Sequence, residues 1–175
     1  MAAHCQKYIF GPFEMVVVEA DERATQQLRS AFEQHRRHVY GLAFWVTGTE
    51  PAAEELMGRV FRRAFLRSSS PNVEMLDRAF ISEVHERAPL GQLTLQAVPV
   101  TSIRNLRSRM LRLDLERAVL RLPLTERLAY LLRDAEGYSF ARIASLIGIS
   151  EADTRHAVHV ARLRICELIA NGFHG

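Results

Sequence analysis

Apolar positions in the first half of the chain recur at helical spacing in three successive stretches. The first stretch ends at Gly48, a residue that allows the chain to leave a helix. Thr49 is a suitable cap for a second helix, and Ser70 followed by Pro71 is a suitable cap and first-turn pair for a third. Three amphipathic helices in a row predict a small three-helix bundle. Their apolar stripes are Leu28, Phe32, Val39, Leu42 and Val46, then Ala53, Leu56, Met57, Val60, Phe61, Ala64 and Phe65, then Val73, Leu76, Phe80 and Val84.

The second half contains residues that typically start and end the helices of a helix-turn-helix. One helix fits between Pro123 and Gly137, and a short second helix fits between Ser139 and Gly148. The turn that follows is tight, and Ser150 with the aspartate three residues later makes a start like a capping box for the last helix. With the preceding helix, these elements predict a four-helix domain.

The last helix is predicted to be amphipathic. Arg155, His159 and Arg162 share one face, which is left for solvent or a partner. The opposite, core-facing side has Ala157, Val158, Ala161, Ile165 and Leu168.

Proline and glycine among uncharged residues from Ala88 to Val100 indicate a linker between the two helical parts. The fold class expected is therefore all-α, with two small helical domains, a three-helix N-terminal bundle and a C-terminal four-helix helix-turn-helix domain, joined by a linker. The expected boundaries are an N-terminal arm at 1–20, a helical domain at 21–87, a linker at 88–111 and a helix-turn-helix domain at 112–175. The arm could be extended, a short strand or a docked tail.

Charge and cysteine content narrow the classes of function. The net charge is only +3, but the segment from Arg104 to Arg121 contains six arginines and only two acidic residues. This local excess of positive charge fits either a nucleic-acid surface or a solvated helix face. The two cysteines lack the spacing of a disulfide framework or a zinc site, and His35 with His38 lacks further ligands, so neither a metal nor a cofactor is expected. No apolar run reaches the length of a membrane span, which favours a cytoplasmic protein.

Two stretches of the sequence resemble one protein family, in the same order. The stretch from Leu122 to Ala170, with LP, Arg127, LLRDAEGYS, GIS and HVARLRICEL, resembles region four of the sigma-70 family of bacterial RNA polymerase specificity factors, extracytoplasmic-function type. The stretch VYGLAFWVTGTEPAAEELMGRVFRRAFLR is similar to regions 2.1 and 2.2 of that family. The resemblance implies that core RNA polymerase and promoter DNA are partners, and an anti-sigma regulator is a further candidate.

The resemblance also implies which residues contact DNA and which contact the polymerase. In the last helix Arg155 is the best candidate for a guanine or phosphate contact, while the neighbouring serines offer backbone N–H groups to phosphates. The candidate DNA-binding residues are Ser139, Ser150, Glu151, Thr154, Arg155, His156, His159 and Arg162. The candidate polymerase-binding residues are Glu54, Glu55, Leu56, Gly58, Arg59 and Arg62.

Region 2 departs from the family pattern in two places. Gly58 stands where the family has an amide, and Arg59 stands where it has an acid, which reverses a charge on the expected polymerase face. In the next helix Phe80 fits a core position, and Asp77 and Glu83 are expected to repel a phosphate backbone, so promoter melting is the least supported part of the resemblance.

These patterns favour a sigma-like transcription initiation factor without enzymatic activity, because neither a phosphate-binding glycine loop nor a nucleophile motif is found. Two alternatives stay open. One is a degenerate relative that has become a protein-interaction module, and the other is a stand-alone DNA-binding transcriptional regulator.

Overall fold

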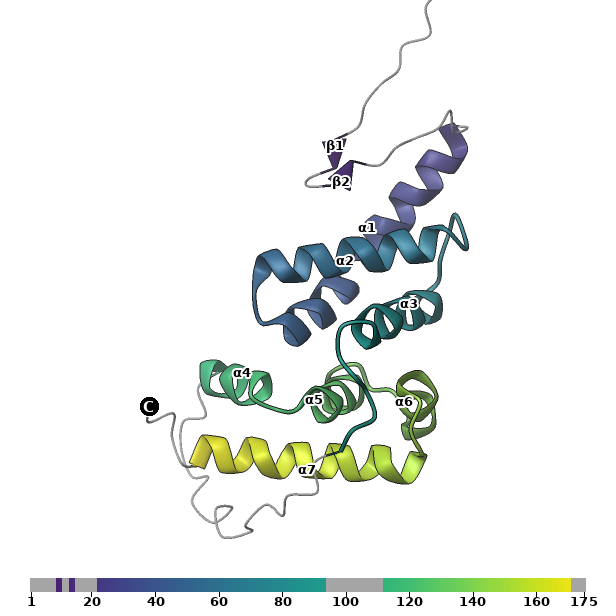
Figure 1. Cartoon of the computed structure of the whole chain (residues 1–175). Coiled ribbons are helices and arrows are strands. Elements are labelled where there is room, and N and C mark those ends of the chain that lie inside the picture. The colour runs from purple at the N-terminus through teal and green to yellow at the C-terminus, as the bar shows by residue number, and fades with distance from the viewer. Residues whose placement is uncertain (1–8, 11–12, 15–21, 94–111, 171–175) are drawn as a thin grey trace, which may run out of the picture.

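The chain folds into two layers of helices. The computed structural model describes residues 9–10, 13–14, 22–93 and 112–170. In Figure 1, α1, α2 and α3 form the upper layer and α4 to α7 form the lower one. The upper helices are α1 (Glu22–Thr47), α2 (Glu50–Phe65) and α3 (Val73–His85). The lower helices are α4 (Arg112–Leu120), α5 (Leu124–Tyr130), a π-helical turn (Leu131–Ala135), α6 (Phe140–Ile147) and α7 (Glu151–Ala170).

The all-α prediction is confirmed, with one small addition in the N-terminal arm. The strands β1 (Ile9–Phe10) and β2 (Phe13–Glu14) pair antiparallel. Residues 94–111, which hold most of the expected linker, lie outside the described residues. Within the described part, no helix combines the length and the apolarity needed to cross a membrane.

Local sequence signals account for most helix ends. Thr49 occupies the N-cap position of α2, as expected, but its side chain makes no capping hydrogen bond. The expected cap of α3 is wrong, because the helix starts two residues later: Asn72 is its N-cap, and the Asn72 side chain accepts a hydrogen bond of 2.9 Å from the backbone N–H of Met75. An asparagine caps as well as a serine, and Pro71 itself is buried just before the helix.

The two layers share one hydrophobic core. Val39, Leu56 and Phe80 of the upper layer belong to the same buried cluster as Leu128 and Ile143 of the lower layer. The chain that leaves α3 contributes as well. Leu90 is buried in this cluster, and the backbone N–H of Gly91 donates a hydrogen bond of 3.1 Å to the hydroxyl of Thr125 at the start of α5.

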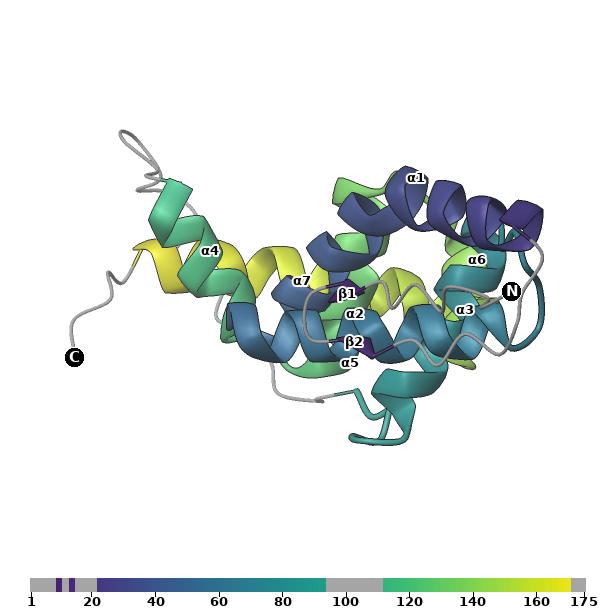
Figure 2. The same cartoon turned by 90° about the horizontal axis from the view of Figure 1, so that it is seen from above.

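The view from above shows the upper layer lying over α5 and α6, while α4 and the C-terminal end of α7 extend beyond it (Figure 2). Trp45 near the end of α1 packs against a second cluster, whose buried residues come from α4 and the residue Leu122 after it, from the π-helical turn and from α7. The two predicted domains therefore pack closely in this structure.

Candidate nucleic-acid interface

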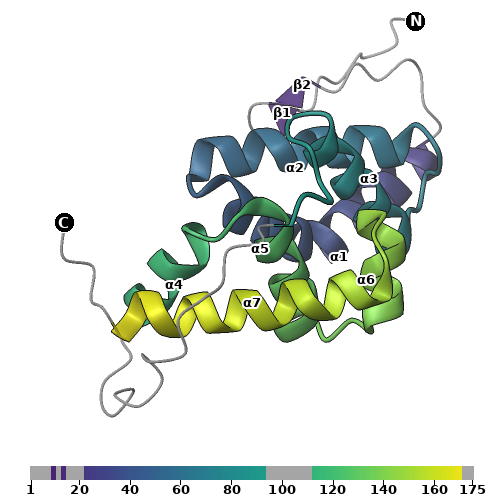
Figure 3. The same cartoon turned by 60° about the horizontal axis from the view of Figure 1, so that its bottom comes forward.

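The helix-turn-helix consists of α6, a tight turn and α7. Ser139 caps α6 with its hydroxyl oxygen, which accepts a hydrogen bond of 3.2 Å from the N–H of Arg142. Gly148 ends α6 with a φ of 80°, a left-handed conformation that favours glycine. Ser150 then caps α7 by accepting a hydrogen bond of 3.0 Å from the N–H of Asp153. Figure 3 shows α7 running along the whole lower layer, with α6 at its N-terminal end and α4 at its C-terminal end.

One face of α7 is free of the core, as the sequence predicted. Arg155, His156, His159 and Arg162 are exposed, as is Glu151 in the first turn. The packing of α1 to α3 onto the lower layer does not cover this face.

Thr154 does not belong to the exposed face. Its side chain is fully buried, at 0% exposure, and its hydroxyl donates a hydrogen bond of 2.9 Å to the backbone carbonyl of Ser150. The expectation that Thr154 approaches a base edge is therefore wrong in this arrangement. The residue helps to hold the first turn of α7 instead.

The two arginines of the exposed face are held by acidic neighbours. Arg162 makes a bidentate pair with Asp134, with Nε and Nη2 at 2.9 and 2.6 Å from the two carboxylate oxygens. This hydrogen bonding raises the pKa of Arg162 above its usual value. Arg155 forms an ion pair with Glu151 one turn earlier in the same helix. A phosphate that approaches either arginine has to compete with a carboxylate already in place.

Ser139 and Ser150 are both exposed, but their hydroxyl oxygens already accept hydrogen bonds as helix caps. The hydroxyl of Ser150 also donates a hydrogen bond of 2.7 Å to the Asp153 carboxylate. What these positions offer a phosphate is the backbone N–H groups of the first helical turn.

The candidate polymerase-binding residues fall on two faces of α2. Glu54, Glu55 and Arg62 are exposed. Leu56, at 1% exposure, and Gly58 are buried against neighbouring helices, so in this arrangement neither can contact a partner directly.

The reversed charge at Arg59 is balanced inside the chain. Its guanidinium lies 3.4 Å from a carboxylate oxygen of Glu83 on α3 and 3.2 Å from one of Glu55 on α2. Arg63 on the next turn pairs with Glu83 at 2.6 Å and with Glu86, and this hydrogen bonding raises the pKa of Arg63. Glu83 is therefore a counter-charge for the arginines of α2, a role that the sequence analysis did not predict.

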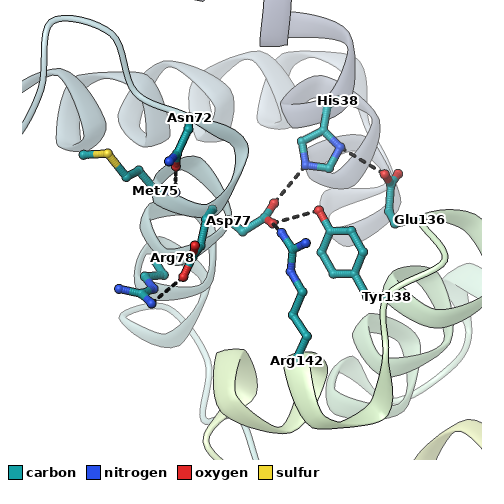
Figure 4. A network of polar contacts seen from close by, with 9 residues as sticks. His38, Asn72, Met75, Asp77, Arg78, Glu136, Tyr138 and Arg142 are labelled. Carbon is teal, nitrogen blue, oxygen red and sulfur yellow. Dashed lines mark hydrogen bonds and ion pairs between the residues drawn. The ribbon is translucent and has the colours of Figure 1, made fainter.

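A polar network joins the two layers around Asp77, which is only 2% exposed (Figure 4). Its carboxylate accepts hydrogen bonds from His38 Nε2 at 2.8 Å, from the Tyr138 hydroxyl at 2.8 Å and from Arg142 Nη2 at 2.7 Å. His38 Nδ1 lies 3.1 Å from a carboxylate oxygen of Glu136. Asp77, which was expected only to repel a phosphate backbone, links α1 and α3 to α6.

The position of Asp77 in the sequence of α3 is a signal for this network. Asp77 lies next to Leu76 and three residues before Phe80, inside the apolar stripe of α3. A carboxylate in such a stripe requires buried partners. Among the described residues, no group of three or more His, Cys, Asp or Glu side chains is arranged to hold a metal ion.

His38 makes the stability of the chain depend on pH. The hydrogen bond to Asp77, followed by the charges of Asp77 and Glu136, raises the pKa of His38 above 6.5. The stabilisation is therefore fully present below pH 6.5 and is lost as the pH rises through the folded-state pKa. We expect the urea midpoint to fall over this range in the wild type, and to fall less in His38→Gln. Burial lowers the pKa of neighbouring His35 and acts in the opposite direction below pH 6.5, so the difference between wild type and variant is the quantity to measure. Equal slopes for both proteins would contradict this assignment.

Known proteins are similar to this chain both over its C-terminal layer and over most of its length. The model of the family described as Sigma-70, region 4 matches residues 112–165, which contain α4 to α6 and most of α7. The ECF RNA polymerase sigma factor SigM of Mycobacterium tuberculosis is 25% identical over 166 residues, covering 87% of this chain and 80% of that protein. Residues 112–165 thus match sigma-70 region 4, and the chain as a whole is similar to sigma factors of the extracytoplasmic-function type.

Further relatives agree with this assignment. The ECF RNA polymerase sigma factor SigE of Mycolicibacterium smegmatis is 25% identical over 168 residues, which cover 86% of this chain and 64% of that protein. The sigma factor RpoE of Bartonella quintana, solved in complex with the anti-sigma factor NepR, has a similar fold. Its TM-score is 0.55 at 19% identity, over 85% of this chain and 98% of that chain. The similarity to sigma-70 family members thus extends to the upper layer, where the sequence pattern of region 2 is most divergent.

Proposed function

We propose that this chain is a transcription initiation factor that binds core RNA polymerase through α1 to α3 and directs it to promoters through α6 and α7. Binding energy, not covalent chemistry, carries out this function. The observation that carries the proposal is the match to region 4 over residues 112–165, on a helix-turn-helix whose last helix keeps a face free.

In this proposal α7 enters the major groove with its N-terminal turn leading. Arg155, His156 and Glu151 lie nearest the base edges, while His159 and Arg162 lie further along and meet phosphates. The backbone N–H groups that follow Ser139 and Ser150 are additional phosphate contacts. Both serines cap helices, so these N–H groups point outward from helix N-termini.

The polymerase contact rests on the exposed part of α2. Glu54, Glu55 and Arg62 are available there, and Arg59 is partly exposed, with 30% of its side chain accessible. Because Glu83 and Glu55 balance Arg59, the reversed charge is partly compensated before a partner arrives. We further propose that an anti-sigma regulator binds the chain, since the structural relative from Bartonella quintana was solved with one.

Replacement of Arg155 by alanine is expected to weaken DNA binding by about 1 to 3 kcal/mol and to change base preference if the guanidinium reads a base. Fluorescence anisotropy with a set of duplexes that differ at single positions measures both effects. Arg36→Ala, which removes an exposed arginine of α1 far along the sequence from the helix-turn-helix, is the control and should bind as the wild type does. Unchanged binding of Arg155→Ala to every duplex would remove the residue from the interface.

The proposed function is tested by assembly with purified core RNA polymerase, followed by run-off transcription on a library of promoter fragments. Stable assembly with new transcripts supports the proposal and identifies the target sequences. Assembly without transcripts would favour an interaction module. Sequence-specific retention of DNA without assembly would favour a stand-alone regulator.

A further inference from the structure

Phe140, the first residue of α6, lies beneath two arginine side chains that come from different elements. The guanidinium carbon of Arg133, in the π-helical turn, is 4.5 Å from the centre of the Phe140 ring. That of Arg155, in the first turns of α7, is 4.6 Å from the same centre. One aromatic ring thus contacts a cation from the element before α6 and a cation from the helix after it.

The two guanidinium groups have few other anchors. Arg133 donates a hydrogen bond of 2.8 Å to the backbone carbonyl of Tyr138, one residue before the cap of α6. Arg155 pairs with Glu151, yet 59% of its side chain remains exposed. The ring of Phe140 is partly buried and packs against the main hydrophobic cluster, so it is a fixed surface for both.

Two positive groups lie over one ring, and Glu151 balances one of them. The negative face of the ring attracts each cation, which offsets their mutual repulsion. A phosphodiester group that approaches this pair would meet side chains whose rotamers the ring already restricts. Such preorganisation strengthens binding because fewer side chains have to be ordered.

We propose that Phe140 is a positioning residue for DNA recognition, and that Arg133 is a further phosphate contact held beside Arg155 by the same ring. This inference rests on the proposed DNA-binding function and adds two residues to it. Phe140 acts through the arginines and does not read a base.

The test compares Phe140→Leu, which keeps an apolar side chain, with Phe140→Tyr, which keeps the ring. The full-length chain is titrated against a fluorescein-labelled mixed-sequence duplex at several salt concentrations. We expect Phe140→Leu to weaken binding about threefold to tenfold. Phe140→Tyr should bind as the wild type does. Arg133→Ala should lower the slope of log affinity against log salt concentration by about one.

A double-mutant cycle distinguishes a role of Phe140 in holding the arginines from a purely structural role. If the ring acts by holding the arginines, Phe140→Leu should have little further effect on DNA binding once Arg133 and Arg155 are both alanine. Phe44→Leu is the matched control, because it removes a partly buried ring that packs against the same cluster but has only aromatic neighbours among its ring contacts in the described residues. It should leave DNA binding unchanged. Thermal unfolding of each variant shows whether a loss of binding comes from a loss of folded protein.

The outcomes distinguish this inference from the function on which it rests. Wild-type binding that is weakened by Arg155→Ala but not by Phe140→Leu would overturn the role of Phe140 alone. A loss in Phe140→Leu that is equally large in the background without both arginines would also overturn it. No binding of the duplex by the wild-type chain, alone or with core polymerase, would overturn the proposed function and this inference together.

Discussion

Arg127→Ala is expected to lower the free energy of unfolding by about 3 kcal/mol, because four partly buried carbonyl groups lose a charged donor. The Arg127 guanidinium donates to the carbonyls of Trp45 and Val46, at 3.3 and 3.0 Å, and to those of Leu122, at 2.8 Å, and Leu120. The carbonyls of Trp45 and Val46 lie in the last turn of α1, and those of Leu120 and Leu122 lie at and just beyond the end of α4, where helices leave acceptors without partners. One side chain therefore donates hydrogen bonds to helix ends in both layers. Its burial lowers the pKa of Arg127.

Urea unfolding and thermal unfolding followed by circular dichroism measure this effect. A loss of about 3 kcal/mol corresponds to a melting temperature lower by about 6 to 12 °C in a chain of this size. Arg127→Lys should be intermediate, because an ammonium group keeps the charge but not the planar fork of donors. The control Arg36→Ala removes an arginine whose ion pair with Glu33 is exposed, and should change stability by less than about 0.5 kcal/mol. If Arg127→Ala were as stable as this control, the helix ends would not depend on the guanidinium.

Asp77→Ala is expected to lower the free energy of unfolding by about 3 kcal/mol, because it breaks a buried, charged network. The hydroxyl of Tyr138, Arg142 and one ring nitrogen of His38 lose their shared acceptor. Arg142 also lies over the Tyr138 ring, 3.7 Å from its centre, so its position depends on two members of the network. Since Asp77 is on α3 and two of its partners are on or next to α6, the packing of the two layers should loosen as well.

Two measurements separate the local effect from the loosening. Urea unfolding gives the loss in stability, and small-angle X-ray scattering gives the radius of gyration, which should increase in Asp77→Ala. Glu74→Ala is the matched control on the same helix, since its pair with Arg78 is exposed and one turn apart, and it should cost about 0.3 to 0.5 kcal/mol. An unchanged radius of gyration together with wild-type stability would show that Asp77 does not hold the layers together.

The helix-turn-helix could be predicted closely because its signals are local. Ser139 and Ser150 cap the helices that follow them, and Gly148 adopts the left-handed conformation that a tight turn favours. Helical spacing placed Arg155 and Arg162 on the exposed face. The same kind of reasoning failed for the cap of α3, because two capping residues lie within three positions and only the packed structure selects Asn72.

The candidate site was predicted less completely, and the misses have one cause. Thr154 follows the exposed Asp153 and precedes Arg155, but the packing of α7 buries it completely. In the sequence Phe140 is an ordinary apolar residue, and only the structure shows that Arg133 and Arg155 lie over its ring. A residue's environment depends on segments that are distant in the sequence, and the pattern along one helix does not contain them.

The sequence by itself determined where the helices lie, where they turn and which side of each is apolar, since hydrogen bonds and caps within a few residues decide these properties. It also carried the resemblance that the family match confirmed over residues 112–165. Only the tertiary structure decided which charged groups are buried and with what partners. His38 and Arg142 reach Asp77 across 39 and 65 positions of the chain, and Arg127 reaches the end of α1 across 82. Such contacts form only when whole layers pack, because the helical period fixes the face on which a residue lies but not what that face meets.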